Sequence, residues 1–203
     1  MIIRTFILPP IENNNYLIID EDSKVAALVD CSSFDERILE ELNNYNAELK
    51  YVLLTHGHFD HIGGLNDLPN GVQVLMHQSD MEWVNEVNTY LPMIGMPNID
   101  IPKIDKFIND GDVIKIGGFD IKVIHTPGHT QGGVCFYVNE NLFSGDTLFK
   151  ESVGRCDLPG GNFEQIVKSI NEKLFTLPEE TIVYPGHGKS TTIGWEKVHN
   201  SYF

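Results

Sequence analysis

The chain has 203 residues, of which 41% are hydrophobic and 21% are charged, the balance of an ordinary globular protein. This length predicts a single domain over residues 1–203 with a sizeable core. The net charge of −15 argues against a nucleic-acid substrate, which needs a basic face on the protein. No stretch approaches the roughly 20 apolar residues that span a bilayer.

Strands come first in the predicted element order. Strands are expected at residues 2–8, 16–19, 25–29, 51–54 and 72–76. Helices are expected at 34–45, with Ser33 as the N-cap, at 62–68 and at 79–87. Residues 88–112 carry three prolines and no sustained period. They predict an irregular connection, either a wall of a cleft or a surface loop.

The second half repeats this order. Strands are expected at 113–116, 119–124, 134–138, 142–143 and 181–184. A helix is expected over 163–174 with Asn162 as its N-cap, and a short helix after His187. Each half therefore consists of strands followed by helices, which predicts two sheets packed together with helices outside.

Metal-binding side chains gather directly after the apolar run at 51–54. This stretch reads Thr55-His56-Gly57-His58-Phe59-Asp60-His61. Loops at strand ends are where a rigid scaffold holds functional groups. Gly57 has a wide choice of backbone conformations, which would let the histidines on either side turn toward one point.

Three later stretches repeat the pattern of a strand, a turn with glycine, and a histidine or aspartate. They are Pro127-Gly128-His129-Thr130, Ser144-Gly145-Asp146-Thr147 and Pro185-Gly186-His187-Gly188. Five imidazoles and two carboxylates suit a pair of divalent metals such as zinc, although iron and manganese accept the same ligands. The predicted ligands are His56, His58, Asp60, His61, His129, Asp146 and His187. One carboxylate can bridge two metals, which would share and activate a water molecule.

This set of motifs, in this order, resembles the metallo-β-lactamase superfamily. The resemblance implies an α+β fold, a four-layer αββα sandwich with two metals at one edge. It implies that Asp146 bridges them. It assigns His56, His58 and His129 to the first metal, and Asp60, His61 and His187 to the second.

Within the superfamily, residues 144–149 and 153–161 resemble hydroxyacylglutathione hydrolases (glyoxalase II) of the short type. The chain is expected to lack the helical C-terminal domain of full-length glyoxalase II. Arg155 is the one candidate for a substrate-binding residue, and it could equally pair with Asp157 or Glu151. The resemblance implies a dinuclear hydrolase for small thioesters such as hydroxyacylglutathione, with hydroxide attacking the carbonyl. Asp60 could also shuttle a proton.

Two alternatives remain open. One is a persulfide dioxygenase with a single ferrous iron held by His56, His129 and Asp146, the two-histidine, one-carboxylate set suited to oxygen chemistry. The other is a lactone or ester hydrolase, because the same hydroxide attacks either bond. The chain is expected to be cytoplasmic, since three sparse cysteines predict free thiols. Nothing in the sequence predicts a membrane partner or the oligomeric state.

Five further polar residues have structural interpretations. His77 and His125 are expected to support the fold or orient a loop, and Asp30 is expected either to bond a ligand histidine or to shape a turn. Cys156 is expected to be a bystander, and His199 is expected on the surface.

Overall fold

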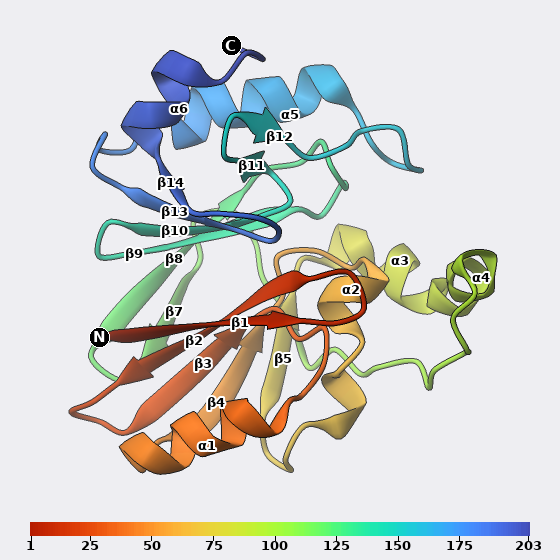
Figure 1. Ribbon diagram of the computed structural model, residues 1–203, viewed down its shortest axis with the longest axis vertical. Helices are drawn as coiled ribbons and strands as arrows, with labels where there is room; N and C mark the ends of the chain where they lie inside the picture. Colours follow the sequence, from red (N-terminus) through yellow and green to blue (C-terminus); the bar gives the residue numbers. More distant parts are fainter.

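The computed structural model describes residues 1–203, which form two sheets stacked face to face with helices outside them. Helix α1 covers the outer face of one sheet, and α5 and α6 cover the outer face of the other (Figure 1). The expected αββα sandwich is therefore confirmed. None of the helices combines the length and apolar character that crossing a membrane requires.

The first sheet has six strands and uses the first half of the chain. Its order is β1 (Ile2–Leu8), β2 (Asn13–Asp20), β3 (Val25–Val29), β4 (Glu48–Leu53), β5 (Gln73–Met76) and β6 (Lys106–Phe107). The strands from β1 to β3 pair antiparallel, and those from β3 to β6 pair parallel. The carboxyl ends of β4 and β5 therefore lie at one edge.

The second sheet also has six strands. Its order is β14 (Thr191–Thr192), β13 (Ile182–Pro185), β10 (Asn141–Gly145), β9 (Val134–Val138), β8 (Phe119–His125) and β7 (Val113–Ile116). Strands β10 and β13 pair parallel, so both deliver the chain to the same edge. A separate hairpin joins β11 (Leu148–Phe149) to β12 (Ser152–Val153).

Six α-helices connect and cover the sheets. They are α1 (Glu36–Tyr45), α2 (Phe59–Ile62), α3 (Met81–Asn85), α4 (Val87–Tyr90), α5 (Phe163–Ser169) and α6 (Ile193–His199). A π-helical turn, Ile170–Leu174, extends α5. The expected cap of α5 is confirmed, because the side chain of Asn162 accepts the backbone N–H of Gln165.

Strand β2 shows why the first sheet is an inner layer. Its residues alternate between two cores, with Tyr16 and Ile18 in the core between the sheets and Leu17 and Ile19 in the core beneath α1. All four side chains are buried. A strand buried on both faces belongs inside a sandwich, since successive side chains point to opposite faces.

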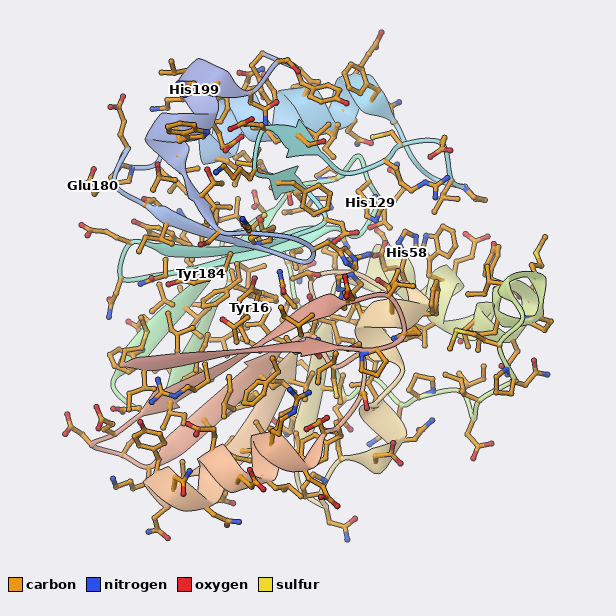
Figure 2. The ribbon with its side chains drawn as sticks, viewed as in Figure 1. Tyr16, His58, His129, Glu180, Tyr184 and His199 are labelled. Atoms are coloured by element: carbon orange, nitrogen blue, oxygen red, sulfur yellow. The ribbon has the colours of Figure 1, made fainter.

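The two sheets are joined by an aromatic contact as well as by aliphatic packing. The ring of Phe143 in β10 packs against Tyr16 and Tyr184, with centroids 5.3 and 5.2 Å away. The hydroxyl of Tyr16 donates to the carbonyl of Pro185 at 2.6 Å. Figure 2 shows Tyr16 and Tyr184 in the layer between the sheets. These contacts hold the amino-terminal half of β2 against the carboxyl end of β13.

Helix α1 begins later than expected. Its N-cap is Asp35, whose side chain accepts the backbone N–H of Arg37, and the predicted cap Ser33 is wrong. The preceding residues are held out of the helix by backbone bonds to residues 61–64. Cys31 donates to the carbonyl of His61 at 2.8 Å and accepts from Gly64 at 2.9 Å.

The helix expected at 62–68 is replaced by α2 and a 3₁₀ turn at Leu65–Asp67. Helix α2 begins inside the histidine stretch, which puts Asp60 in its first turn, where a carboxylate suits the helix dipole. The helix expected at 79–87 is broken at Glu86 into α3 and α4. The short strands β6, β11, β12 and β14 were not predicted, because two residues are too few to show a period.

Candidate metal centre

Four strand ends bring the seven predicted ligands together. His56 and His58 follow β4, and the next two ligands lie in α2. His129 follows β8, and Asp146 directly follows β10. His187 follows β13. The two sheets meet at this edge, which is why residues up to 131 positions apart converge. We call this set of seven side chains the donor cluster.

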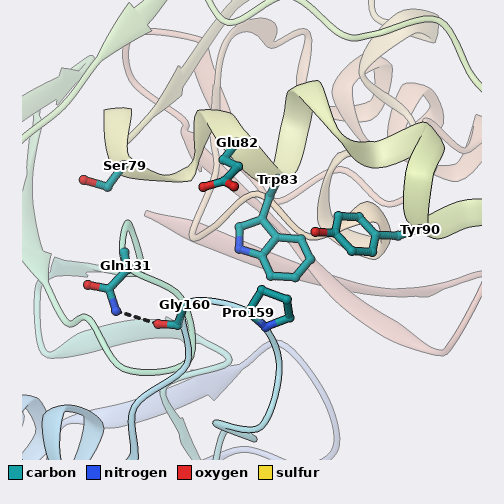
Figure 3. Close-up of a pocket in the computed structure, with 7 residues that line it drawn as sticks. All are labelled: Ser79, Glu82, Trp83, Tyr90, Gln131, Pro159 and Gly160. Atoms are coloured by element: carbon teal, nitrogen blue, oxygen red, sulfur yellow. Dashed lines mark hydrogen bonds between the residues drawn. The ribbon is translucent and has the colours of Figure 1, made fainter.

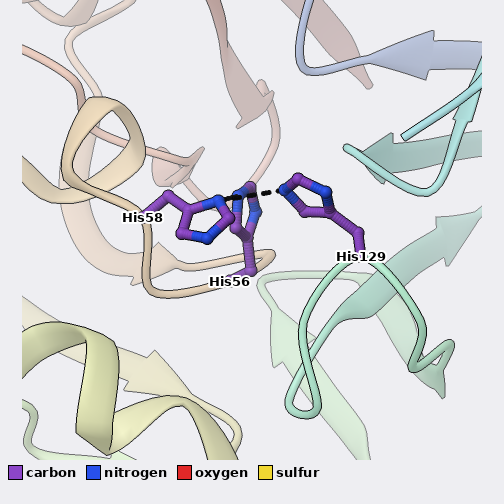
Figure 4. Close-up of side chains that lie close together, drawn as sticks. All are labelled: His56, His58 and His129. Atoms are coloured by element: carbon purple, nitrogen blue, oxygen red, sulfur yellow. Dashed lines mark hydrogen bonds between the residues drawn. The ribbon is translucent and has the colours of Figure 1, made fainter. Parts of the chain in front are cut away.

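Three histidines form the first part of the donor cluster (Figure 4). Nδ1 of His58 lies 3.0 Å from Nε2 of His56 and 3.0 Å from Nε2 of His129. All three rings are buried. A tetrahedral zinc with bonds of about 2.0–2.1 Å places neighbouring donor atoms about 3.4 Å apart, close to this spacing. We call these residues the three-histidine group.

Hydrogen bonds on the far side of two of these rings, those of His56 and His129, leave their inner nitrogens unprotonated. Nδ1 of His129 lies 2.7 Å from the carbonyl oxygen of Arg155, which can only accept. The hydroxyl of Thr55 donates to Oδ2 of Asp30 at 2.9 Å and so accepts from Nδ1 of His56 at 3.1 Å. Both histidines therefore point a lone pair inward, as metal ligands require.

The second part of the donor cluster contains Asp60, His61 and His187. Oδ2 of Asp60 lies 3.1 Å from Nε2 of His187 and 3.4 Å from Nε2 of His61. Gly186 is required here by space, because a Cβ on it would lie 2.2 Å from Oδ1 of Asp146. We call these three residues the Asp60 group.

Asp146 lies between the two groups. Its Oδ1 is 3.5 Å from Nε2 of His61, and its Oδ2 is 3.6 Å from Nε2 of His129. Oδ1 is buried and has no hydrogen-bond partner. A buried carboxylate oxygen without a partner is costly unless a cation or donor meets it. The donor set, its spacing and this free oxygen all fit divalent metals.

Burial and mutual charge set the protonation of these groups. Burial lowers the pKa of His58 to about 3 and holds the pKa of His56 well below its ordinary value. Burial alone would raise the pKa of Asp146, but the charges of His61 and His129 outweigh it and hold that pKa well below the usual range. His56 and His58 are therefore neutral and Asp146 is charged, which are the forms that bind metal. Burial alone would lower the pKa of His61, but the charges of Asp30 and Asp60 outweigh it and hold that pKa well above its ordinary value, so a metal at this ring must displace a proton.

A family model of the metallo-β-lactamase superfamily matches residues 8–187. The chain belongs to this superfamily. It is 36% identical over 194 residues to hydroxyacylglutathione hydrolase GloC of Haemophilus influenzae, which covers 93% of this chain and 92% of GloC.

Two solved structures are similar over nearly the whole chain. The BLEG-1 B3 metallo-β-lactamase has a TM-score of 0.90 and 35% identity and covers 99% of both chains. TTHA1623 in a di-iron-bound form has a TM-score of 0.86 and 33% identity, covering 98% of this chain and all of that one. The expected superfamily membership, with its glyoxalase II likeness, is confirmed.

Two buried polar residues around the centre were missed from the sequence. The carboxylate of Asp80 accepts the N–H of Gly57 at 3.0 Å, the hydroxyl of Thr130 at 2.8 Å and the N–H of Gly132. It therefore joins the loop of the three-histidine group to the loop that carries His129. A lone acidic residue in a predicted helix carries no signal for such a role.

The other missed residue is Asn13. Its Nδ2 lies 2.8 Å from Nε2 of His61, and a metal at that nitrogen would replace the amide as its partner. Asn15 donates to the oxygen of Asn13 at 2.9 Å, which fixes the orientation of the amide. Three consecutive asparagines at the start of a strand were the available signal, because asparagine is depleted in strands.

The other polar residues singled out from the sequence have the following surroundings in the structure. His125 donates to the carbonyl of Gln131 at 2.9 Å and so orients the loop that carries His129. His77 stacks on His125 with centroids 4.3 Å apart, and His199 is exposed. Arg155 pairs with Asp157 at 2.7 and 2.8 Å, while its role in substrate binding stays a prediction.

Glycine is required at position 57 for a different reason from the one expected. Its φ is not positive, so it needs no special backbone conformation. A Cβ at this position would lie 2.8 Å from the carbonyl oxygen of Asp80 and 3.1 Å from Cβ of Trp83. Glycine is therefore required because α3 passes close to the loop.

Proposed function

We propose that the chain is a dinuclear metallohydrolase whose substrates are small thioesters such as hydroxyacylglutathione. The single observation that carries this proposal is the position of Asp146 between two complete three-residue donor groups. The likeness to GloC supports the thioester class. We place the enzyme in the reducing cytoplasm, which accords with its three free cysteines.

The three-histidine group would hold one metal and the Asp60 group the other, with Asp146 joining them. Zinc is our first choice, and iron or manganese are alternatives that fit the same donors. Such metals, when bound, lower the pKa of a bound water and polarise a carbonyl. The di-iron form of TTHA1623 supports iron as an alternative.

The chain's own residues orient the donors and handle protons. Thr55 and the carbonyl of Arg155 hold the imidazoles of His56 and His129 with their lone pairs inward. Neighbouring histidines outweigh the effect of burial on Asp60 and lower its pKa, so it is a carboxylate that can accept a proton from the water nucleophile. Asp60 is therefore our candidate for a proton shuttle.

The nature of the leaving group favours a thioester over an amide. A thiol has a free pKa of about 8.5, so a thiolate departs without a strong acid. An amide nitrogen must be protonated as it leaves. The titratable groups in the centre are the proposed ligands and the carboxylates of Asp30 and Asp80. Asp30 and Asp80 accept hydrogen bonds from the ligand loops, so no group is left over as a dedicated acid. An ester or lactone substrate remains a further alternative.

A persulfide dioxygenase is the second candidate function. Its iron would be held by His56, His129 and Asp146. Oδ2 of Asp146 lies 3.6 Å from His129, and one ligand atom of His56 lies within 4.8 Å of Asp146. A single iron at this triad would leave the three donors of the Asp60 group without a metal, which is why we place the dioxygenase second.

One paired experiment tests the proposal. The metal content of protein purified from its own host is measured, and the same sample is assayed for thiol release from lactoylglutathione and for oxygen uptake with glutathione persulfide. We expect two metals per chain and thiol release. One iron per chain, with persulfide-dependent oxygen uptake and no thiol release, would overturn the proposal.

A further inference from the structure

A cavity of about 140 Å³ lies beside the donor cluster (Figure 3). Trp83 of α3 and Tyr90 of α4 form its aromatic wall. The remaining lining residues are Ser79, Glu82, Gln131, Pro159 and Gly160. We call this cavity the Trp83 pocket.

The Trp83 pocket adjoins the three-histidine group directly. The indole of Trp83 stands perpendicular to the imidazole of His58, with ring centroids 4.2 Å apart. On the opposite side, Gln131 follows His129 by two residues and its amide donates to the carbonyl of Gly160. A group bound in the pocket therefore lies next to the proposed reaction centre, because the indole of Trp83 lines the pocket and also contacts His58.

The size of the pocket matches one ring. An apolar cavity of about 150 Å³ in another protein holds a benzene molecule. The rings of Trp83 and Tyr90 lie 4.8 Å apart and are tilted by 38°, so they present aromatic surface to an occupant. Aromatic rings pair favourably in offset and tilted arrangements. A tripeptide such as glutathione is too large for this space.

The charge of the lining disfavours anions. Glu82 is the one charged lining residue, and no lysine or arginine lines the pocket. The guanidinium of Arg155, whose backbone carbonyl contacts His129, is bound at two points by Asp157. A carboxylate on the occupant would meet Glu82 without a compensating cation, whereas a neutral ring would not.

We propose that the Trp83 pocket binds the acyl part of the substrate and selects thioesters whose acyl group carries a neutral, ring-sized apolar substituent. This inference rests on the proposed thioester hydrolase for its assignment to the acyl group. Of the two parts of a glutathione thioester, the acyl group is the one small enough to fit this space whole, and glutathione's own carboxylates would be repelled by Glu82.

The first experiment measures specificity. The ratio of kcat/KM for phenylacetylglutathione to that for succinylglutathione is compared between the wild type and Trp83→Ala. We expect the wild type to prefer the phenylacetyl compound and the variant to lose about tenfold or more of that ratio, mainly through KM. Glu82→Gln should raise kcat/KM for the succinyl compound. Trp83→Phe should restore much of the ratio.

Trp195→Ala is the matched control, because Trp195 is exposed in α6 and outside the pocket. It should leave the ratio unchanged. The outcome that would overturn the pocket proposal is thioester hydrolysis by Trp83→Ala and Tyr90→Ala with the same ratio of kcat/KM values as the wild type. That outcome would leave the proposed function intact.

The second experiment needs neither metal nor activity. The chain has two tryptophans, so in Trp195→Phe the fluorescence comes from Trp83 alone. Metal-free Trp195→Phe is titrated with phenylacetamide and with phenylacetate. We expect a saturable change in fluorescence with the neutral amide and binding several-fold weaker with the carboxylate. Absence of a saturable change with the amide would overturn the pocket proposal.

The two proposals can fail separately. Saturable binding of phenylacetamide in a chain that hydrolyses no thioester would support the pocket and contradict the proposed function. Binding of the carboxylate as tight as that of the amide would overturn the charge selectivity that we assign to Glu82.

Discussion

Oδ2 of Asp30 lies 2.8 Å from Nδ1 of His61, and both side chains are buried. The same carboxylate accepts the backbone N–H of Thr55 at 2.8 Å and its hydroxyl at 2.9 Å. Asp30 thus orients one ring of the Asp60 group directly and one ring of the three-histidine group through Thr55. This confirms the first of the two interpretations that the sequence left open for Asp30.

Replacing Asp30 by asparagine should weaken metal binding. Asp30 has a φ of 59°, which asparagine tolerates, so the backbone is expected to survive. An amide must present its NH₂ either to Thr55 or to His61, both of which are donors. We expect metal affinity to fall about 10–100-fold, the usual cost of losing such a partner.

Competition with a chromophoric chelator measures this affinity. Asp120→Asn is the matched control, since Asp120 is exposed on β8 and far along the strand from the ligands. Equal affinity in Asp30→Asn and the control would show that Asp30 does not orient His61.

Asp60→Ala tests whether the centre is dinuclear. It removes one of the three donors of the Asp60 group, so the second metal and most thioester activity should disappear together. We expect metal affinity and activity to fall by more than the about 10–100-fold that follows when the hydrogen-bond partner of a ligand is removed. Metal analysis and thiol release measure the two effects, with exposed Asp67→Ala as the control. Unchanged metal content and turnover would refute the dinuclear hydrolase.

Asp80→Asn should destabilise the fold and loosen the three-histidine group. All three partners of Asp80 are donors, so the amide would leave a donor facing a donor in a buried site. We expect the free energy of unfolding to fall by about 1–3 kcal/mol, the cost of an unsatisfied buried group. Urea unfolding of metal-free protein measures it, with exposed Asp100→Asn as the control. A loss no larger than in the control would contradict this assignment.

His77 should make the stability of the metal-free protein depend on pH. Partial burial and the stacked His125 lower the pKa of His77, and Asp110 opposes them. The unfolded side chain has a pKa near about 6.5. As the pH falls through that value, the unfolded chain binds a proton that the folded chain does not, so the free energy of unfolding decreases.

The variant His77→Phe lacks this effect and keeps an aromatic ring against His125. When the pH is lowered from 7.5 to 5.5, the free energy of unfolding of the variant should therefore decrease less than that of the wild type. Urea unfolding at both pH values measures it, with exposed His199→Phe as the control. A parallel decline in wild type and variant would exclude His77 as the source.

The sequence by itself determined the order of the elements, the αββα class and the seven predicted ligands. Apolar runs ending in a glycine turn and a histidine or aspartate are local patterns, and they depend only on neighbours along the chain. The strand ends were predictable for the same reason, since His129, Asp146 and His187 each follow an apolar strand.

Only the tertiary structure decided which side chains surround the ligands. Asp80 and Thr130 are 50 positions apart, and no period or motif in either segment indicates their hydrogen bond. The same holds for Trp83 against His58, which depends on how α3 packs beside the loop. Such contacts arise from the packing of elements whose local sequences are ordinary, so they appear only when the two sheets meet.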